Sequence, residues 1–493
     1  MGLKLYNTLT RRLEDFIPRS DVVGIYTCGL TVQGPPHVGH IRAALVRDIL
    51  MRWLSHLGHK VKALENFTDI DDKIIEKQKE YKQDWRIISQ KNIETYLRAC
   101  DELNITRADV YPRASQHIEE IISLVQRLID KGYAYEKKGD VYFRVRKFPD
   151  YGRFSKKSID ELMAGARIEP TESKDDPLDF TLWKAAKPGE PYWLSPWGKG
   201  RPGWHIECSA MSMHYLGETF DIHTGGEDLI FPHHENEIAQ SVAATGKEFV
   251  RFWLHNGWVT LTGEKMSKST GHYSPIKDVL ERYSSNVIRL FMLKTHYRKQ
   301  LEYADERLHE ARSAYATIKT YLDKHGDVPQ ISEPLMRDTF TEAMNDDLNT
   351  SRALAVLYEL ITEGNECKDD RRAKEIAASV KYYYTLLGFI EEVEEVVEPY
   401  KAVVQILSDV KKRLREEKRD SVLESITSID DFELLKDIKN IYPLIIRLLL
   451  RIRDELRKEK DYEFADYIRE RLSESGIFVD DSTKGSTYRR EVR

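Results

Sequence analysis

The feature that most constrains the fold is a strand–helix–strand pattern between residues 21 and 72. An apolar run from Val22 to Thr27 precedes a stretch from Ile41 to Leu57 in which apolar residues recur at helical spacing. Gly58 ends that stretch, and a second strand-like run extends from Val61 to Thr68. Consecutive strands joined by a helix are parallel neighbours in one sheet. The pattern therefore predicts a parallel α/β sheet.

A short motif, His37-Val38-Gly39-His40, lies where the first strand meets the helix. This position puts two imidazoles at a helix N-terminus, where backbone N–H groups and the positive end of the helix dipole favour a bound phosphate. Gly39 has no side chain to keep an adenine ring at a distance. Taken alone, the motif is equally compatible with an ordinary surface turn.

A second motif, Lys265-Met266-Ser267-Lys268-Ser269, follows another strand-like run. Its two ammonium groups can stabilise charge on a triphosphate whose α-phosphorus is attacked, and then on the leaving pyrophosphate. The two motifs together predict a nucleoside triphosphate site. They resemble the HIGH and KMSKS signatures of class I aminoacyl-tRNA synthetases, which are built on a Rossmann-like sheet. Val38 stands in the isoleucine position.

The rest of the chain indicates several domains, since 493 residues with 41% hydrophobic content can bury a substantial core. We expect an α/β fold with a Rossmann-like parallel-sheet catalytic domain interrupted by an insertion, then an α-helical bundle and a small C-terminal anticodon-binding domain. The predicted divisions are catalytic residues 1–113, an insertion at 114–203, catalytic residues 204–305, a bundle at 306–400 and a C-terminal region at 401–493.

Composition excludes few functions. The N-terminal residues lack the apolar core of a signal peptide, and the most apolar stretch, 444–452, is interrupted by Arg447 and Arg451. We therefore expect a cytoplasmic protein without a membrane partner. The net charge of -6 does not exclude nucleic acid, because phosphate contact depends on local basic patches.

The four cysteines are widely spaced and form no CxxC pair, so a disulfide scaffold is not expected. Cys28 directly follows the first strand, and Cys208 lies in the opening turns of a helix that Gly217 ends. His233 and Glu237 have i, i+4 spacing and share a helical face, with Pro232 suited to a first helical position. Two thiolates, an imidazole and a carboxylate form a sensible Zn²⁺ set. Lone cysteines are more often small buried hydrophobes, which is our interpretation of Cys100.

Four longer strings resemble those of cysteinyl-tRNA synthetases, and the resemblance covers nearly the whole chain. The strings are Phe67–Lys73, Gly200–Met211, Phe220–Leu229 and Phe231–Gln240. The resemblance implies that Cys28, Cys208, His233 and Glu237 hold one Zn²⁺ that accepts the thiolate of substrate L-cysteine. A closed zinc site that only braces the fold is the alternative.

The resemblance also implies a role for each motif. His37 and His40 would stabilise the transition state at the α-phosphate of ATP, which binds with Mg²⁺, while Lys265 and Lys268 hold the β- and γ-phosphates. Further residues are implied to contact ATP, including its ribose, namely Gly39, Gly226 and Asp228. The implied cysteine pocket contains Gly29, Thr68 and Trp204. His205, His223 and His234 are candidates to line the same pocket, although each could equally be a core residue.

The implied macromolecular partner is tRNA(Cys), whose terminal adenosine would receive the cysteinyl group on its 2′-hydroxyl. Near the C-terminus, the residues that resemble an anticodon reader are Arg457, Tyr462, Asp466 and Asp481. A tyrosine packed inside the bundle and a merely solvated basic face are the alternatives. The chain departs from many relatives at Gln33-Gly34, in place of Tyr-Asp, and at Thr270-Gly271-His272, in place of Leu-Gly-Asn.

Three other functions compete with this interpretation. A ligase could activate cysteine in the same way and transfer it to a small amine, although the long helical C-terminus disfavours this. A related protein could bind tRNA without catalysis, although the intact histidine and lysine motifs disfavour that. A hydrolytic zinc enzyme needs an open metal position, and four protein ligands argue against one.

Overall fold

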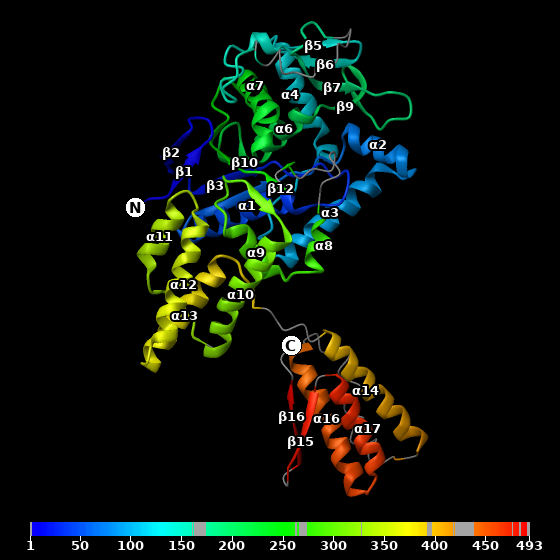
Figure 1. Ribbon diagram of the computed structural model, residues 1–493. Helices are drawn as coiled ribbons and strands as arrows, with labels where there is room; N and C mark the ends of the chain where they lie inside the picture. Colours follow the sequence, from blue (N-terminus) through cyan, green and yellow to red (C-terminus); the bar gives the residue numbers. More distant parts are fainter. Residues whose placement is uncertain are drawn as a thin grey trace. The chain divides into compact units, whose positions relative to one another are not determined.

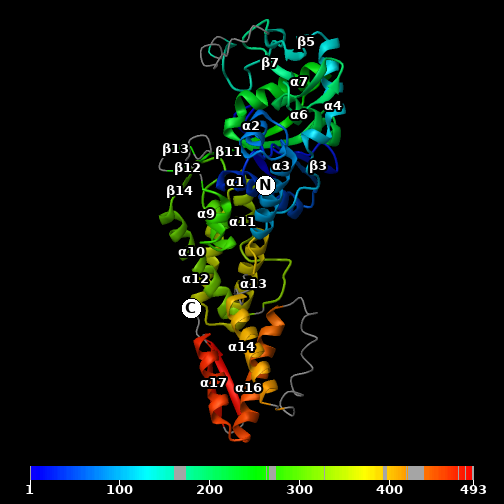
Figure 2. The same cartoon turned by 90° about the vertical axis from the view of Figure 1, so that its right-hand side faces the viewer.

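The computed structural model describes residues 2–159, 161, 174–261, 264–265, 274–326, 328–391, 397–417, 419, 438–475, 477–482 and 485–490. The chain divides into two compact units, Met1–Ile390 and Glu391–Arg493. Figures 1 and 2 show the two units in views turned by 90°. The five-part division expected from the sequence stays a prediction.

The centre of the first unit is a parallel sheet with strand order β11-β10-β3-β4. Its members are β3 (Val22–Thr27), β4 (Lys60–Glu65), β10 (Phe220–Gly226) and β11 (Val250–Asn256). Helix α1 (Val38–His56) joins β3 to β4, which confirms the predicted strand–helix–strand unit. The strands are buried along most of their length, as expected of a sheet covered on both faces.

Helix α1 begins three residues earlier than the apolar periodicity suggested. The periodic residues Ile41, Leu45, Ile49 and Trp53 are all buried, but His37 is the N-cap, so the first motif forms the first turn of the helix itself. The helix ends at His56, and Gly58 follows with a φ of 88°. That left-handed value suits glycine and explains why the helix stops there.

The insertion between the halves of the parallel sheet is itself largely a sheet. Helices α2 (Asp72–Tyr81), α3 (Trp85–Glu102) and α4 (Ile118–Asp130) lead to antiparallel strands in the order β5-β6-β7-β9-β8. The strands are β5 (Ala134–Lys137), β6 (Asp140–Phe143), β7 (Phe180–Ala185), β8 (Trp193–Ser195) and β9 (Gly198–Pro202). The sequence analysis predicted no sheet here, because strands of three to six residues are too short to show clear alternation.

A small sheet and several helices complete the first unit. The sheet contains β12 (Val259–Leu261), β13 (Glu264–Lys265) and β14 (Leu301–Tyr303), with β12 between the other two. Helices α8 (Ile276–Leu280) and α9 (Ser285–Leu293) precede β14. The strands β1 (Lys4–Asn7) and β2 (Arg12–Asp15) form a separate hairpin near the N-terminus.

The predicted helical bundle after residue 305 is present. It contains α10 (Asp305–His325), α11 (Arg337–Asn345), α12 (Thr350–Glu366) and α13 (Asp370–Leu386), and α11, α12 and α13 lie side by side in both views. Asn349 caps α12, since its side chain accepts a hydrogen bond from the backbone N–H of Arg352. Asparagine is among the residues preferred at this N-cap position.

The second unit has its own core. Helices α14 (Val397–Glu416), α16 (Ile438–Lys458) and α17 (Tyr462–Glu474) pack with an antiparallel hairpin of β15 (Ile477–Ser482) and β16 (Gly485–Arg490). Apolar residues that recur at helical steps in the sequence are buried in this core, namely Ile445, Ile452, Leu456, Phe464, Ile468 and Leu472. The hairpin was not predicted. Much of the charge-rich stretch 391–437 lies outside the described residues.

Among the helices of the described part of the chain, none combines the length and apolarity needed to cross a bilayer.

Candidate active site and metal centre

The candidate site lies between β3 and β10, where the chain changes the side of the parallel sheet on which it adds the next strand. From β3 the chain moves to β4 on one side, while from β10 it moves to β11 on the other. Crevices outside the carboxyl ends of strands at such a switch point are the usual ligand sites of open α/β sheets. Cys28 follows β3, and Gly226 ends β10. Cys28, Gly226 and the His37 cap of the helix that follows β3 therefore lie at the ends of adjacent central strands.

The first motif caps α1 in a way that orients both imidazoles. The Nδ1 atom of His37 accepts a hydrogen bond from the backbone N–H of Gly39 at 3.1 Å, and the Nδ1 of His40 accepts from the backbone N–H of His37 at 3.2 Å. The two rings stack with centroids 3.7 Å apart. Because Nδ1 uses its lone pair as an acceptor, the ring proton of each neutral imidazole resides on Nε2.

Gly39 lies against the first of these rings. A Cβ atom at this position would approach Cε1 of His37 to 3.0 Å. A larger residue would therefore push the His37 ring away from its capping position.

The second motif begins on the small sheet beside α1. Lys265 ends β13, and its backbone pairs with Thr260 of β12. Lys268 lies outside the described residues. When the described chain resumes, the backbone N–H of Ile276 donates to the carbonyl of Pro36 at 3.1 Å, and the N–H of Val38 donates to the carbonyl of Ser274 at 3.3 Å. The segment that follows the second motif thus lies against the first motif, although more than 200 residues separate them in the sequence.

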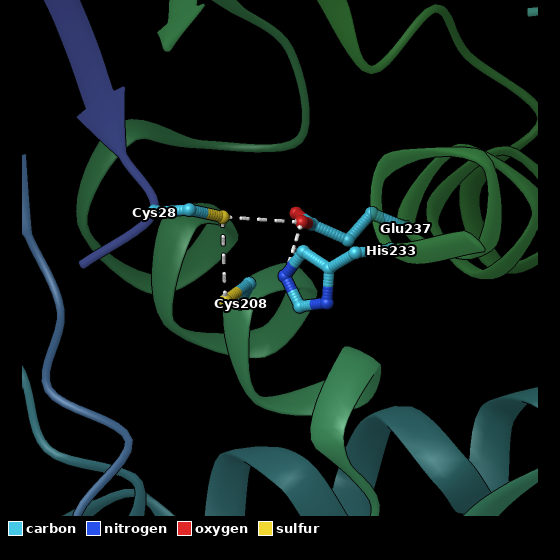
Figure 3. Close-up of side chains that lie close together, drawn as sticks. All are labelled: Cys28, Cys208, His233 and Glu237. Carbon is cyan, nitrogen blue, oxygen red and sulfur yellow. Dashed lines mark hydrogen bonds and ion pairs between the residues drawn. The ribbon is translucent and has the colours of Figure 1, made fainter. Parts of the chain in front are cut away.

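The four predicted metal ligands meet at a point. Figure 3 shows Cys28 from the end of β3, Cys208 from helix α6 (Trp204–Leu216), and His233 and Glu237 directed toward one another. One ligand atom of each lies within 4.8 Å of the others, and all four residues are buried. The Gly217 end predicted for the helix of Cys208 is confirmed.

One local detail was wrong. Pro232 does not begin an α-helix: residues Ile230–His234 form a separate kinked turn, and α7 (Glu235–Thr245) begins only at Glu235. The predicted proximity nevertheless holds across this junction, because Nε2 of His233 is 3.0 Å from Oε1 of Glu237.

Three of the donor-atom separations are close to the edges of a tetrahedral zinc site. The two sulfur atoms are 3.8 Å apart, and the Sγ of Cys28 is 3.5 Å from Oε1 of Glu237. Zinc–ligand bonds of about 2.3 Å to sulfur and 2.0 Å to oxygen give tetrahedral edges of about 3.8 and 3.5 Å. The His233–Glu237 edge is slightly shorter than the corresponding value. The set combines two soft thiolates, a borderline imidazole and a harder carboxylate, all of which are donor types found at zinc sites.

The charges within this cluster are strongly coupled. Burial opposes ionisation of each group, but His223 and His233 lower the pKa of Glu237 to about 2. Burial likewise disfavours charge on His233, yet Glu237 and Cys208 raise its pKa to about 10. Although burial raises the pKa of Cys208, contact with Cys28 helps to bring it to about 6. The positive charge of protonated His233 offsets the Glu237 carboxylate and the Cys208 thiolate, and a bound metal cation would take over this role.

Further histidines surround the four ligands. Nδ1 of His233 is 2.8 Å from Nδ1 of His205, so a proton shared there leaves Nε2 of His233 directed at the cluster, as is usual for metal-bound histidine. His223 contacts Oε2 of Glu237 at 3.1 Å, and His234 lies 3.4 Å from the Sγ of Cys28. His255, which the sequence analysis missed, bonds to Nδ1 of His234 at 2.8 Å. No regular spacing in the sequence relates His255 to the other histidines or to the four candidate ligands.

The predicted cysteine-pocket residues border the same cluster. The backbone N–H of Gly29 donates to the side chain of Asn66 at 3.0 Å, and a Cβ at Gly29 would lie 1.7 Å from the carbonyl oxygen of Asn66. The buried hydroxyl of Thr68 donates to Glu207, beside Cys208. Trp204 begins α6 and lies over His233, with ring centroids 4.6 Å apart. Asn66 and Glu207 were not singled out in the sequence.

The remaining predicted residues occupy different places. Gly226 ends β10 and is in close contact with exposed Asp228, since a Cβ there would lie 2.5 Å from Oδ1 of Asp228. In the second unit Arg457, Tyr462 and Asp466 are exposed. Tyr462 is 56% exposed, so the alternative of a buried bundle tyrosine is wrong. Asp481 lies on β15, and only its backbone is described.

Comparison with known proteins agrees with this geometry. The family model for the class I (C) tRNA synthetase catalytic domain matches residues 17–313, and that for the DALR domain matches residues 339–391. The chain is 44% identical to the Cysteine--tRNA ligase of Persephonella marina over all of both chains. It is also 44% identical to that of Sulfurihydrogenibium sp., over 99% of this chain and all of the relative.

A solved structure extends the comparison to the fold. Mycobacterium tuberculosis methionyl-tRNA synthetase, in complex with methionyl-adenylate, matches 74% of this chain and 89% of its own length with a TM-score of 0.53. Its sequence identity is 15%, so this similarity concerns the fold alone. The full-length sequence similarity to Cysteine--tRNA ligases indicates the closer relationship. On these grounds the chain belongs to the cysteinyl-tRNA synthetase family, with a class I catalytic domain.

Proposed function

We propose that this chain activates L-cysteine with ATP and transfers the cysteinyl group to the 3′-terminal adenosine of tRNA(Cys). The observation that carries the proposal is that the cluster of candidate metal ligands and the His37–His40 turn lie at one switch point of the sheet, with Lys265 on the small sheet beside α1. Full-length similarity to Cysteine--tRNA ligases supports the same activity.

Cys28, Cys208, His233 and Glu237 would hold Zn²⁺. When bound, the ion supplies a soft acceptor for the substrate thiolate that the hydroxyl of serine cannot match. A pocket that judges shape alone separates such near-isosteres by about 10²-fold, whereas accurate translation needs about 10⁴-fold or better. The difference corresponds to roughly 3 kcal/mol. Selective sulfur recognition can provide it without a separate editing domain.

The neighbouring side chains would shape the amino-acid pocket. Gly29 lets the turn after Cys28 pack directly against the backbone of Asn66, because a side chain there would collide with its carbonyl oxygen. Thr68 is held by Glu207, and Trp204 presents its exposed ring beside His233. These residues orient cysteine so that its carboxylate faces the nucleotide.

In the first step a carboxylate oxygen of cysteine attacks the α-phosphorus of ATP, and pyrophosphate leaves. No protein nucleophile is needed, so the rate comes from positioning and charge stabilisation. The Nε2–H groups of His37 and His40 donate to the α-phosphate, while Lys265 and Lys268 neutralise the β- and γ-phosphates that bind Mg²⁺. Gly226 and Asp228 contact the ribose at the end of β10.

In the second step the 2′-hydroxyl of the terminal adenosine attacks the carbonyl carbon of cysteinyl-adenylate, and AMP leaves. The second unit would bind the anticodon arm. Exposed Tyr462 can stack on an unpaired base, and Arg457, Asp466 and Asp481 would contact base edges.

Two assays on the purified chain test the proposal. Cysteine-dependent exchange between ATP and labelled pyrophosphate is expected, together with charging of tRNA(Cys). Serine should support little exchange. Exchange without charging would instead indicate transfer to a small acceptor, and absence of exchange, with an active control enzyme present, would show that the chain is a non-catalytic relative.

A further inference from the structure

Arg42 is a buried cation bonded to backbone carbonyls. It lies two residues after the first motif on α1, is 2% exposed, and no described carboxylate accepts a hydrogen bond from it. Burial lowers its pKa to about 10, so the guanidinium is charged at neutral pH. A buried charge without a directly bonded counter-ion is costly unless its hydrogen bonds are satisfied.

The partners of Arg42 come from two separate segments. One terminal nitrogen donates to the carbonyls of Gly257 and Trp258, at 3.0 and 2.9 Å. The other donates to those of His296 and Tyr297, at 3.4 and 3.3 Å, and to that of Lys299. The first segment lies between β11 and β12, and the second directly precedes β14.

Those two segments form the base of the sheet that leads to Lys265. The backbone N–H of Gly257 donates to the carbonyl of Tyr297 at 2.9 Å, and a Cβ at Gly257 would lie 2.5 Å from the carbonyl oxygen of Lys299. Beyond this contact, β12 pairs with β14 in parallel and with β13 in antiparallel register. The position of Lys265 therefore depends on where residues 257–258 and 296–299 are held.

Helix α1 and the turn before it consequently bind the described chain on both sides of the second motif. Arg42 holds the segment from which β12 and β13 extend. On the far side, Ser274 and Ile276 are hydrogen-bonded to Val38 and Pro36 at the start of the same helix. The shared helix supports both the imidazoles that face the α-phosphate and the strand on which Lys265 lies.

We propose that Arg42 is a positioning residue for the activation step: its guanidinium fixes the β12–β13 hairpin relative to the His37–His40 turn. The inference rests on the proposed function. A guanidinium presents four terminal N–H groups in a plane and can span two segments, whereas the compact ammonium of lysine cannot reach all five carbonyls. Charge alone is therefore insufficient at this position.

The test compares Arg42→Lys with Arg47→Lys. Arg47 is a matched control because it is fully buried on the same helix, but its partners are Glu65 and the carbonyl of Thr106, away from β12. Single-turnover formation of cysteinyl-adenylate should slow between about 10- and 100-fold in Arg42→Lys. The KM for cysteine should remain within about twofold of the wild-type value.

A second measurement separates positioning from general damage. Enzyme-bound adenylate, accumulated over a long incubation and freed of ATP, is mixed with tRNA(Cys). The transfer rate of Arg42→Lys should match that of the wild type, because pyrophosphate has already left. Hydrogen exchange at residues 257–261 and 301–303 should be faster in Arg42→Lys and unchanged in Arg47→Lys. Arg42→Gln serves as a second variant if the lysine variant folds poorly.

Three results would overturn the proposal: equal slowing of activation and transfer in Arg42→Lys, equal slowing of activation in Arg47→Lys, or unchanged hydrogen exchange at residues 257–261. If the wild-type protein lacked cysteine-dependent exchange between ATP and pyrophosphate, the proposed function would be refuted instead. The comparison of hydrogen-exchange rates would still test the structural role of Arg42.

Discussion

At the scale of single residues, the four cysteines show how surroundings decide chemistry. Cys208 lies 3.8 Å from Cys28, in a cluster with an imidazole and a carboxylate. Cys100 is equally buried, but burial raises its pKa to about 12, and it belongs to no candidate metal group among the described residues. The prediction that Cys100 is a small core hydrophobe agrees with its place in the main hydrophobic core.

We expect Cys208→Ser to lose bound zinc and the preference for cysteine over serine, because a hydroxyl is a poor ligand for a soft site. The preference should fall by about 10²-fold or more. The affinity for ATP should change by less than about twofold. Metal analysis and exchange assays with each amino acid measure the effects. Cys100→Ser is the control and should retain the metal. Parallel loss of metal, selectivity and ATP affinity would indicate a structural zinc.

At the scale of secondary-structure elements, α1 organises the first unit. Besides the first motif and Arg42, it contributes Asp48, which is fully buried and pairs with Arg289 of α9 and Arg52. Arg289 also donates to the carbonyls of Leu103 and Leu387, near the ends of α3 and α13. One buried ion pair therefore joins the parallel sheet's first helix to the helical bundle.

Asp48→Asn should lower the free energy of unfolding by about 3–5 kcal/mol, because it leaves the Arg289 charge buried without a partner. Urea denaturation measures this change. Asp101→Asn is the control: its pair with Arg107 is exposed and is worth about 0–1 kcal/mol. If Asp48→Asn lowered the free energy of unfolding no more than Asp101→Asn, the stabilising role of the Asp48–Arg289 pair would be contradicted.

The same pair predicts a pH dependence. Burial alone would raise the pKa of Asp48, but Arg289 and Arg52 lower it below its ordinary value. Its ionised form therefore stabilises the fold above an unfolded-state pKa of about 3.9, and this contribution is lost as the pH falls below that value. The difference in stability between the wild type and Asp48→Asn should narrow below about pH 4.

At the scale of the whole molecule, the chemistry and the proposed anticodon contacts belong to different compact units. Every residue assigned to activation belongs to Met1–Ile390, whereas Arg457, Tyr462, Asp466 and Asp481 belong to Glu391–Arg493. Each unit has its own hydrophobic core. Binding energy from the second unit can raise the affinity for tRNA without altering the activation site.

A chain ending at Ile390 should therefore keep cysteine-dependent pyrophosphate exchange and lose efficient charging. The kcat/KM for tRNA(Cys) should fall by about 10²-fold or more, since one of two linked binding surfaces is removed. Circular dichroism and thermal unfolding check that the fragment folds. Charging at the full-length rate would show that the second unit does not contribute to tRNA binding.

Much of the architecture could be read from local patterns. The helix of residues 41–57, the flanking strands, the Asn349 cap and the buried faces of α16 and α17 follow from spacing within about one element length. The short strands of the insertion and the β15–β16 hairpin could not be predicted in this way. Segments of three to six residues carry little periodic signal, and strand pairing depends on distant partners.

The sequence by itself determined the strand–helix–strand unit, the helical regions and, through its resemblance to a known family, the identity of the candidate site residues. Tertiary structure alone decided how these residues meet. The partners of Arg42 lie more than 200 positions away, as does Arg289 from Asp48, and His255 reaches the histidines around the candidate metal ligands from another strand. The physical reason is that helix periodicity and capping act over a few residues, whereas a buried charge finds its partners only after the chain has packed.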